Sequence, residues 1–175
     1  MLRPADDPLI QGLAEGREEA FAALYDCFAA SLFRVAVAML GSPQDAEDVV
    51  QEVFVAVFRG RWRLRQVENL RAYLFAALRR AAARRATAAS RQRSLSPQEL
   101  AQISSPESIE QDEEQSLRLE RALRALPAEQ REAITLKMDG GLTFAEIAIV
   151  LGISANTAAS RYRYGLEKLR AALEA

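Results

Sequence analysis

The sequence has no histidine and only one cysteine among its 175 residues. Without histidine, the chain lacks the usual general base of enzymes and the commonest protein ligand for metals. A single cysteine excludes an internal disulfide, and neither a nucleophile elbow nor a glycine-rich phosphate loop is present. We therefore expect no catalytic residues, no metal site and no cofactor. Cys27, which lies between Leu24 and Phe28 in an apolar pattern, is predicted to be a buried apolar residue.

Long hydrophobic runs are also missing. The unbroken apolar runs at residues 35–40 and 53–58 are far shorter than the roughly 18 residues that a membrane-spanning helix needs. The acidic start of the chain carries no apolar signal-peptide core. We expect a cytoplasmic protein without membrane insertion.

The small net charge of -1 hides a strong segregation of charge along the chain. Residues 1–58 carry a net charge of -7, residues 59–93 of +10, residues 94–120 of -6 and residues 121–175 of +2. The basic block contains 11 arginines, so its attraction to phosphate would be local and sensitive to salt. The acidic segments would direct a different face of the protein toward a different partner.

Helical periodicity dominates the first part of the chain. Apolar residues at steps of three and four predict a helix over residues 17–39, which Gly41 ends. Ser42, Pro43 and Asp45 then provide an N-cap, a first-turn proline and an acid in the first turn, which predict the start of a second helix. The inward sides are predicted to hold Phe21, Leu24, Tyr25, Phe28, Leu32, Val35 and Met39 in the first helix, and Val49, Val50, Val53, Phe54, Val57 and Phe58 in the second.

A basic connector at residues 59–68, with the only tryptophan, Trp62, leads to a third, arginine-rich helix predicted over residues 69–89. The composition then becomes rich in serine, glutamine, proline and acids, which is typical of a linker. We predict an all-α fold with two small helical domains, residues 1–90 and 116–175, joined by a flexible linker over residues 91–115.

The end of the chain has the pattern of a helix-turn-helix. Thr143 and Glu146 form a capping box that opens a short helix, and Gly152 can adopt the left-handed conformation that ends it. Ser154 then caps a longer helix over residues 155–172. A short helix, a glycine turn and a longer helix with small polar residues near its start suit reading of the major groove. The face opposite the apolar stripe of the longer helix holds Asn156, Ala159, Ser160 and Arg163, with Arg161 at its edge.

Two segments in this order carry a resemblance to a known family. Residues 45–58, DAEDVVQEVFVAVF, are similar to the segment with which bacterial sigma factors of the extracytoplasmic-function (ECF) group grip core RNA polymerase. Residues 126–170, from LPAEQ to EKLR, are similar to the carboxy-terminal DNA-binding region of the same group. The chain as a whole resembles an ECF sigma factor.

The resemblance implies a protein that performs no covalent chemistry, binds core RNA polymerase, directs it to promoters and assists opening of the duplex. It implies core polymerase-binding residues Asp45, Glu47, Asp48, Gln51 and Glu52. For the minus-ten element it implies Trp62, Arg71, Arg79, Arg80, Arg84 and Arg85, with Tyr73 and Phe75 as further stacking candidates. For the minus-thirty-five element it implies Asn156, Ala159, Ser160 and Arg163 on bases and Arg161 on phosphate. The implied partners are core RNA polymerase, promoter DNA and an anti-sigma factor, with a monomeric free protein.

Two other functions stay open at this point. A stand-alone helix-turn-helix regulator would bind duplex DNA as a dimer, but it leaves the acidic second helix without a role. A sigma-like adaptor would bind polymerase without opening promoters. This second alternative rests on departures in the third helix, which has Arg79, Arg80, Arg84 and Thr87 where the family commonly has Arg-Asn, Asp and Arg.

Overall fold

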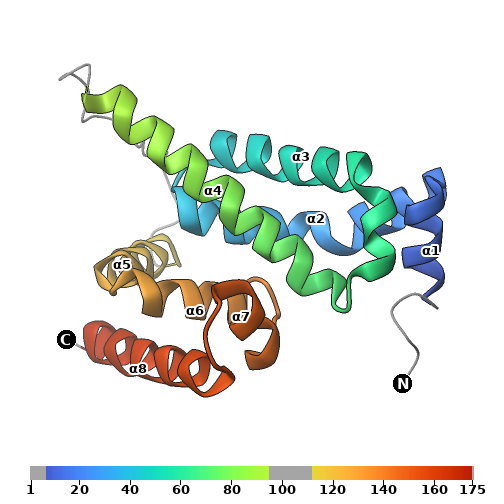
Figure 1. Ribbon diagram of the computed structural model, residues 1–175. Helices are drawn as coiled ribbons and strands as arrows, with labels where there is room; N and C mark the ends of the chain where they lie inside the picture. Colours follow the sequence, from blue (N-terminus) through green and yellow to red (C-terminus); the bar gives the residue numbers. More distant parts are fainter. Residues whose placement is uncertain (1–6, 95–111, 175) are drawn as a thin grey trace.

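The computed structural model describes residues 7–94 and 112–174, and every regular element in these ranges is helical (Figure 1). The predicted all-α class is therefore confirmed. The linker predicted over residues 91–115 lies largely outside the described ranges, and its ends, 91–94 and 112–115, belong to helices. In chain order the elements are α1 (Pro8–Glu15), α2 (Glu18–Leu40), α3 (Pro43–Arg59), the 3-10 helix η2 (Arg61–Gln66), α4 (Leu70–Ser94), α5 (Asp112–Ala125), α6 (Ala128–Met138), α7 (Phe144–Leu151) and α8 (Ala155–Glu174).

Polar side chains cap the helices where the chain turns. The Ser42 hydroxyl accepts a hydrogen bond from the Asp45 amide at 3.3 Å and starts α3 as predicted. Asn69 does the same for α4, where its side-chain oxygen accepts from the Ala72 amide at 2.8 Å. Gly41, at φ 70°, ends α2 in the left-handed conformation, which glycine adopts without steric cost.

Two elements of the amino-terminal half, α1 and η2, were not predicted. Helix α1 is short, but Asp7 caps it and its buried residues Ile10 and Leu13 pack it against α2 and η2. The predicted basic connector forms η2 because Leu64, which is fully buried, anchors it within the core. Helix α1 therefore supports the segment that carries Trp62.

Helices α2, α3 and α4 enclose the main apolar core, but several side chains differ from the predicted pattern. Tyr25 and Phe58, predicted to face inward, are 57% and 51% exposed. The prediction that Cys27 is buried is also wrong, because it lies on the exposed side of α2. The apolar stripe of α2 is wider than the face that packs on α3 and α4, so its margin stays in solvent. Phe75 was predicted as a candidate for stacking on a base, but its side chain is fully buried and is not available for stacking.

The helix-turn-helix is confirmed in detail. Thr143 and Glu146 form the reciprocal capping box of α7, and Gly152 ends this helix at φ 68°. The Ser154 hydroxyl accepts from the Thr157 amide at 3.0 Å and so caps α8. Gly165 lets α8 approach α6 closely, since an added Cβ would lie 2.7 Å from Cδ1 of Ile134.

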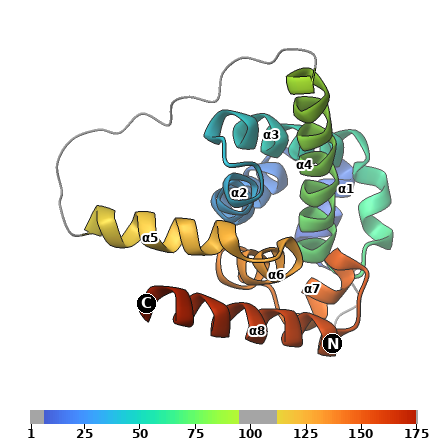
Figure 2. The same ribbon diagram turned by 90° about the vertical axis from the view of Figure 1, so that its left-hand side faces the viewer.

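One hydrophobic cluster spans both halves of the chain, and a second, smaller one lies within the carboxy-terminal half. Figure 2 shows α6 and α7 beside α2 and α4, and α7 contacts α4 while α6 contacts α2. Leu142 and Ile147 belong to the same buried cluster as Leu74 and Phe75 of α4. At Gly140 the approach is so close that an added Cβ would lie 3.1 Å from the Phe75 ring. The sequence did not predict this docking of the carboxy-terminal helices on α4.

Helix α2 is long and apolar enough, by length and composition, to cross a membrane. Scattered polar residues interrupt this helix, so it contains no long unbroken apolar run. Its buried residues, Leu24, Leu32, Val35 and Ala36, lie in the main core, so one side of α2 packs within the folded protein.

Candidate functional site

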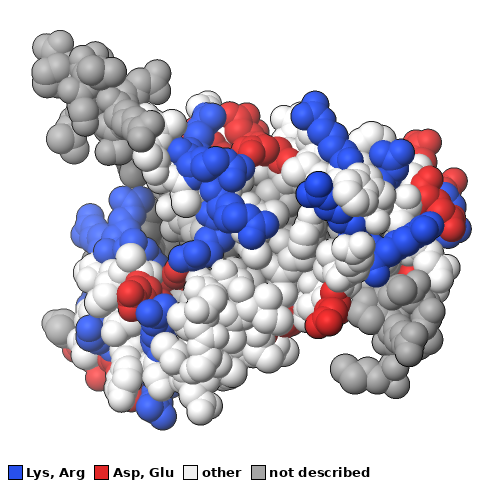
Figure 3. All heavy atoms as spheres, viewed as in Figure 1, with Lys and Arg blue, Asp and Glu red and all other residues white. Residues whose placement is uncertain are grey.

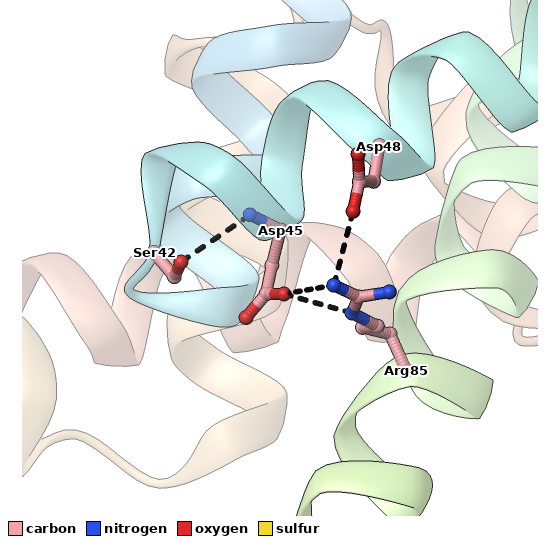
Figure 4. Close-up of polar contacts among 4 residues, drawn as sticks. All are labelled: Ser42, Asp45, Asp48 and Arg85. Carbon is pink, nitrogen blue, oxygen red and sulfur yellow. Dashed lines mark hydrogen bonds and ion pairs between the residues drawn. The ribbon is translucent and has the colours of Figure 1, made fainter.

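Three acids of α3 lie against two arginines of α4. Asp45, Asp48 and Glu52 are spaced by three and four residues, so they share one side of α3. Arg85 donates from Nε to Asp45 Oδ1 at 2.8 Å and from Nη2 to Asp48 Oδ2 at 3.0 Å (Figure 4). Arg84 forms a single contact, from Nη2 to Oε1 of Glu52. The acids predicted for polymerase and two arginines predicted for DNA are therefore in contact with one another.

These ion pairs change the electrostatics of Arg85. The hydrogen bond and the charge of Asp45, with the added charge of Asp48, hold the pKa of Arg85 above its ordinary value. In Figure 3, blue side chains gather over the exposed side of α4, with red side chains beside them at its upper end. This end of α4 thus presents alternating positive and negative groups to solvent.

The remaining predicted acid, Glu47, and Gln51 line a groove between α2 and α3. The groove has a volume of about 880 Å³, and its apolar wall includes Tyr25, Phe54 and Val55. The Tyr25 and Phe54 rings lie 5.1 Å apart, and Val55 is 41% exposed. Sequence analysis missed these wall residues because helical periodicity does not separate an apolar groove from an apolar core. Asp48 belongs to both the groove lining and the ion pair with Arg85.

Two other α4 arginines contact the carboxy-terminal half of the chain. The Arg79 guanidinium forms a two-point ion pair with Glu132 of α6, with Nη2 and Oε2 3.4 Å apart. Arg71 donates from Nη1 to the Gly140 carbonyl at 3.2 Å and lies over the Phe28 ring. Arg80 is exposed, and no carboxylate partner is found for it among the described residues.

Glu146 joins the helix-turn-helix to the start of α4. Its carboxylate accepts from the Thr143 amide at 2.8 Å and from the Asn69 side-chain amide at 3.2 Å. Burial raises the pKa of Glu146, but these hydrogen bonds and the charge of Arg71 outweigh that effect, so the pKa lies below its ordinary value. Glu146 is therefore a charged group at the junction of the two halves.

An exposed basic and aromatic surface lies on η2 and the end of α3. Trp62 is 60% exposed, and the Arg63 guanidinium lies 4.6 Å from the centre of its ring. Phe58 is exposed as well, with Arg61 over its ring at 5.1 Å. Arg61, Arg63 and Phe58 were not predicted site residues, although the alternation of arginine and aromatic residues in this segment was a signal for them. Such a surface can stack bases and contact phosphates.

The predicted DNA-reading residues of α8 differ in their environment. Asn156 and Arg163 are exposed, and the Arg163 guanidinium lies over the Tyr164 ring. Ala159 and Ser160 are half-buried, which leaves small side chains at the surface of the helix. Arg161 forms an ion pair with Glu129 of α6 at 2.9 Å. The exposed side chains in the first two turns of α8 are therefore the small residues Ala155, Asn156 and Thr157.

Within residues 7–94 and 112–174, no group of three or more acids or cysteines is arranged to hold a metal ion. The polar clusters that are present pair arginines with carboxylates.

Comparisons with known proteins agree with this geometry. Residues 24–92 match the family model for sigma-70 region 2, and residues 116–169 match that for sigma-70 region 4. Among solved structures, the sigma factor RpoE in complex with the anti-sigma factor NepR from Bartonella quintana shares the fold at a TM-score of 0.68. It is 22% identical, and the match covers 89% of this chain and 98% of that one.

Curated relatives give the closer sequence match. The chain is 32% identical to the ECF RNA polymerase sigma factor SigL of Mycobacterium tuberculosis over 94% of its own length and 95% of SigL. It is also 32% identical to the ECF RNA polymerase sigma factor SigE of Mycolicibacterium smegmatis over 79% of its own length, and the match spans 56% of that relative. The chain belongs to the family of ECF RNA polymerase sigma factors.

Proposed function

We propose that this chain binds core RNA polymerase through the α2–α3 groove and the acids beside it, and so directs the polymerase to promoters. The observation that supports this most is the apolar wall of the groove, with Tyr25 and Val55 exposed beside Glu47, Asp48 and Gln51. Exposed apolar patches with a polar rim are typical of protein interaction sites. An amphipathic helix with basic residues along its edge fits such a groove.

The arginine-rich surface supports a role in binding the minus-ten element. Arg80 of α4 and Trp62 of η2 are exposed, and Arg71, Arg79, Arg84 and Arg85 lie on the same helix as Arg80. Opening a duplex costs unstacking energy, which stacking of bases on aromatic rings and contacts of arginine with phosphate offset. We assign the assistance of promoter opening to this surface.

The second DNA site in the proposal is the start of α8. Asn156, Ala159, Ser160 and Arg163 would face the bases of the minus-thirty-five element in the major groove, and Arg161 would contact phosphate. Arg161 forms an ion pair with Glu129, so it would have to leave this carboxylate in order to contact a phosphate.

We also propose an anti-sigma factor as a third partner, because RpoE, whose solved structure has a similar fold, is in complex with one. It places the free protein in the cytoplasm as a monomer, where polymerase and promoter DNA are available. Core polymerase, promoter DNA and the anti-sigma factor would then compete for, or share, the surfaces described above.

Run-off transcription with purified core polymerase tests the proposal, on a library of genomic fragments from the source organism. We expect transcripts from discrete start sites that core polymerase alone does not produce. Tight polymerase binding without such transcripts would instead identify a sigma-like adaptor. Duplex DNA binding by a stable dimer that does not bind polymerase would identify a stand-alone regulator.

A further inference from the structure

A second cavity lies between the two halves of the chain. It is formed where α5 and α6 lie beside the end of α2 and the start of α3 (Figure 2). Its volume is about 910 Å³, which is within the range of roughly 300–1,000 Å³ that is typical of small-molecule sites. None of the residues assigned above to polymerase or to DNA lines it. The cavity is therefore a candidate site for a ligand of its own.

Part of the cavity lining is apolar. Phe33 and Val37, one turn apart on α2, and Leu123 of α5 line it, and each of these side chains is half-buried. Ala38, the next residue of α2, lines the cavity from an exposed position. An apolar ligand body that covered these side chains would be removed from water, which favours binding in proportion to the area covered.

The charged side chains of the lining are mostly positive. Arg34, Arg124 and Arg131 line the cavity, against one acid, Asp139. Arg34 donates from Nη2 to the Asp139 carbonyl at 3.3 Å, and Arg131 donates from Nη1 to the Arg124 carbonyl at 3.0 Å. Within residues 7–94 and 112–174, neither Arg34 nor Arg131 forms an ion pair with a carboxylate. The cavity is thus complementary to an anion, and a carboxylate is the organic anion that best matches the fork of an arginine.

The α6 side of the cavity is shielded from solvent. Thr135 is only 4% exposed although it lines the cavity, so its side chain lies at the inner wall. Asp139 lies one turn further along α6, and burial raises its pKa above the ordinary value despite the nearby charge of Arg34. Hydrogen bonds to a charged ligand are stronger in such a shielded environment than in open water.

We propose that this cavity binds a small monocarboxylic acid with an apolar chain. The carboxylate would lie at Arg34 and Arg131, and the chain would lie along the apolar part of the lining. The bound acid would contact α2 of one half and α5 and α6 of the other. It would therefore favour the docked arrangement of the two halves over arrangements in which they separate. This site is independent of the function proposed above.

Titration of the full chain with octanoate, followed by the NMR shifts of backbone amides, tests the site. The matched neutral probe is 1-octanol, which has the same chain length and no charge. We expect octanoate to shift the amides of Ala38, Leu123 and Thr135 and to bind about 3-fold to 10-fold more tightly than 1-octanol. Equal affinities for the two probes, or no shifts at the cavity, would overturn the proposal.

Two charge variants should change the octanoate affinity in opposite directions. Arg34→Gln removes a positive charge from the cavity and should weaken binding by about 1.5-fold to 5-fold, whereas Asp139→Asn removes a negative charge and should tighten it by a similar factor. The control is Arg65→Gln, an exposed arginine of η2 outside the cavity, which should change the affinity by less than about 1.5-fold. Changes of the same sign in Arg34→Gln and Asp139→Asn would overturn the placement of the carboxylate.

A steric variant shows whether octanoate binds in this cavity. Ala38→Trp fills its apolar part from an exposed position and should remove octanoate binding at an unchanged melting temperature. The control is Ala23→Trp, at an exposed position of α2 that lines neither this cavity nor the α2–α3 groove. Retained binding by Ala38→Trp would place octanoate elsewhere and overturn the proposal. Tighter binding of a hexaglutamate peptide than of octanoate would also overturn it, because the cavity would then suit an acidic protein segment.

Discussion

Arg79 of α4 and Glu132 of α6 form a two-point ion pair that joins the two halves of the chain across 53 positions of sequence. The pair lies beside an apolar contact in which Phe75 packs against the turn at Gly140. An arginine that the proposal assigns to DNA is therefore held by the carboxy-terminal half of the same protein.

Charge reversal at Glu132 should destabilise the junction. Glu132→Lys places two positive groups together, and we expect a loss of about 1 kcal/mol in the free energy of unfolding. The matched control is Glu129→Lys, which breaks the pair with Arg161 inside the carboxy-terminal half. An energy-transfer pair with one dye in each half should report a longer distance for Glu132→Lys only, and equal distances in both variants would contradict the prediction.

A methyl group at Gly140 should separate α4 from the α6–α7 turn. An added Cβ would lie 2.7 Å from the Leu136 carbonyl and 2.8 Å from Cδ1 of Leu142. We expect Gly140→Ala to lower the free energy of unfolding, measured by urea denaturation, by about 1–3 kcal/mol. Gly60→Ala is the comparison, because its Cβ would meet only the Ala56 carbonyl, at 3.2 Å. If Gly140→Ala lowered the free energy of unfolding no more than Gly60→Ala does, the turn at Gly140 would be able to accommodate the added methyl group.

Protonation of Glu146 should weaken the helix-turn-helix at low pH. The folded state lowers the pKa of this group below the ordinary value of 4.5, so its stabilisation is present above that pH and is lost as the pH falls through the folded pKa. At pH 7 we expect Glu146→Gln to cost about 1 kcal/mol, because the capping box loses its charge. Urea denaturation over a pH series should show this difference shrinking toward acid pH. A difference independent of pH would exclude the carboxylate as its source.

Ionisation of Asp139 should destabilise the folded protein, whereas ionisation of Glu146 stabilises it. Burial raises its pKa above the ordinary value of 3.8 despite the nearby charge of Arg34, and a carboxylate at the end of α6 opposes the helix dipole. Its charged form therefore costs stability as the pH rises through the folded pKa. We expect Asp139→Asn to stabilise the protein by about 0.3–1 kcal/mol at pH 7. Thermal denaturation should show no gain below the ordinary pKa, and a gain that persists there would have another cause.

The local structure was largely predictable because its signals are short in sequence. Ser42 before Pro43, the Thr143 and Glu146 capping box, and Gly152 each act on residues within one helical turn, and all were found as predicted. Helix α1 lacks a long periodic pattern, and η2 depends on the burial of Leu64 by distant residues. Neither could be read from neighbouring residues alone.

The sequence predicted many residues of the candidate site, but it did not predict which of them contact one another. The carboxylates of α3 and the arginines of α4 stood out by composition, but their pairing depends on how two helices separated by η2 pack. The exposure of each side chain was hardest to predict. Tyr25 and Phe75 both follow the apolar periodicity of their helices, but helix packing leaves Tyr25 in a groove and buries Phe75 in the core.

The proposed function depends most on binding of core RNA polymerase through the α2–α3 groove. The direct measurement is the polymerase affinity of Val55→Asp, which places a charge on the exposed apolar wall of the groove. The control Ala56→Asp adds the same charge at the next, exposed position of α3, which does not line the groove. We predict tight binding by the wild type, a loss of about 10-fold or more in Val55→Asp and near-wild-type binding in the control. No binding by the wild type, or equal losses in both variants, would show that polymerase does not bind at this groove.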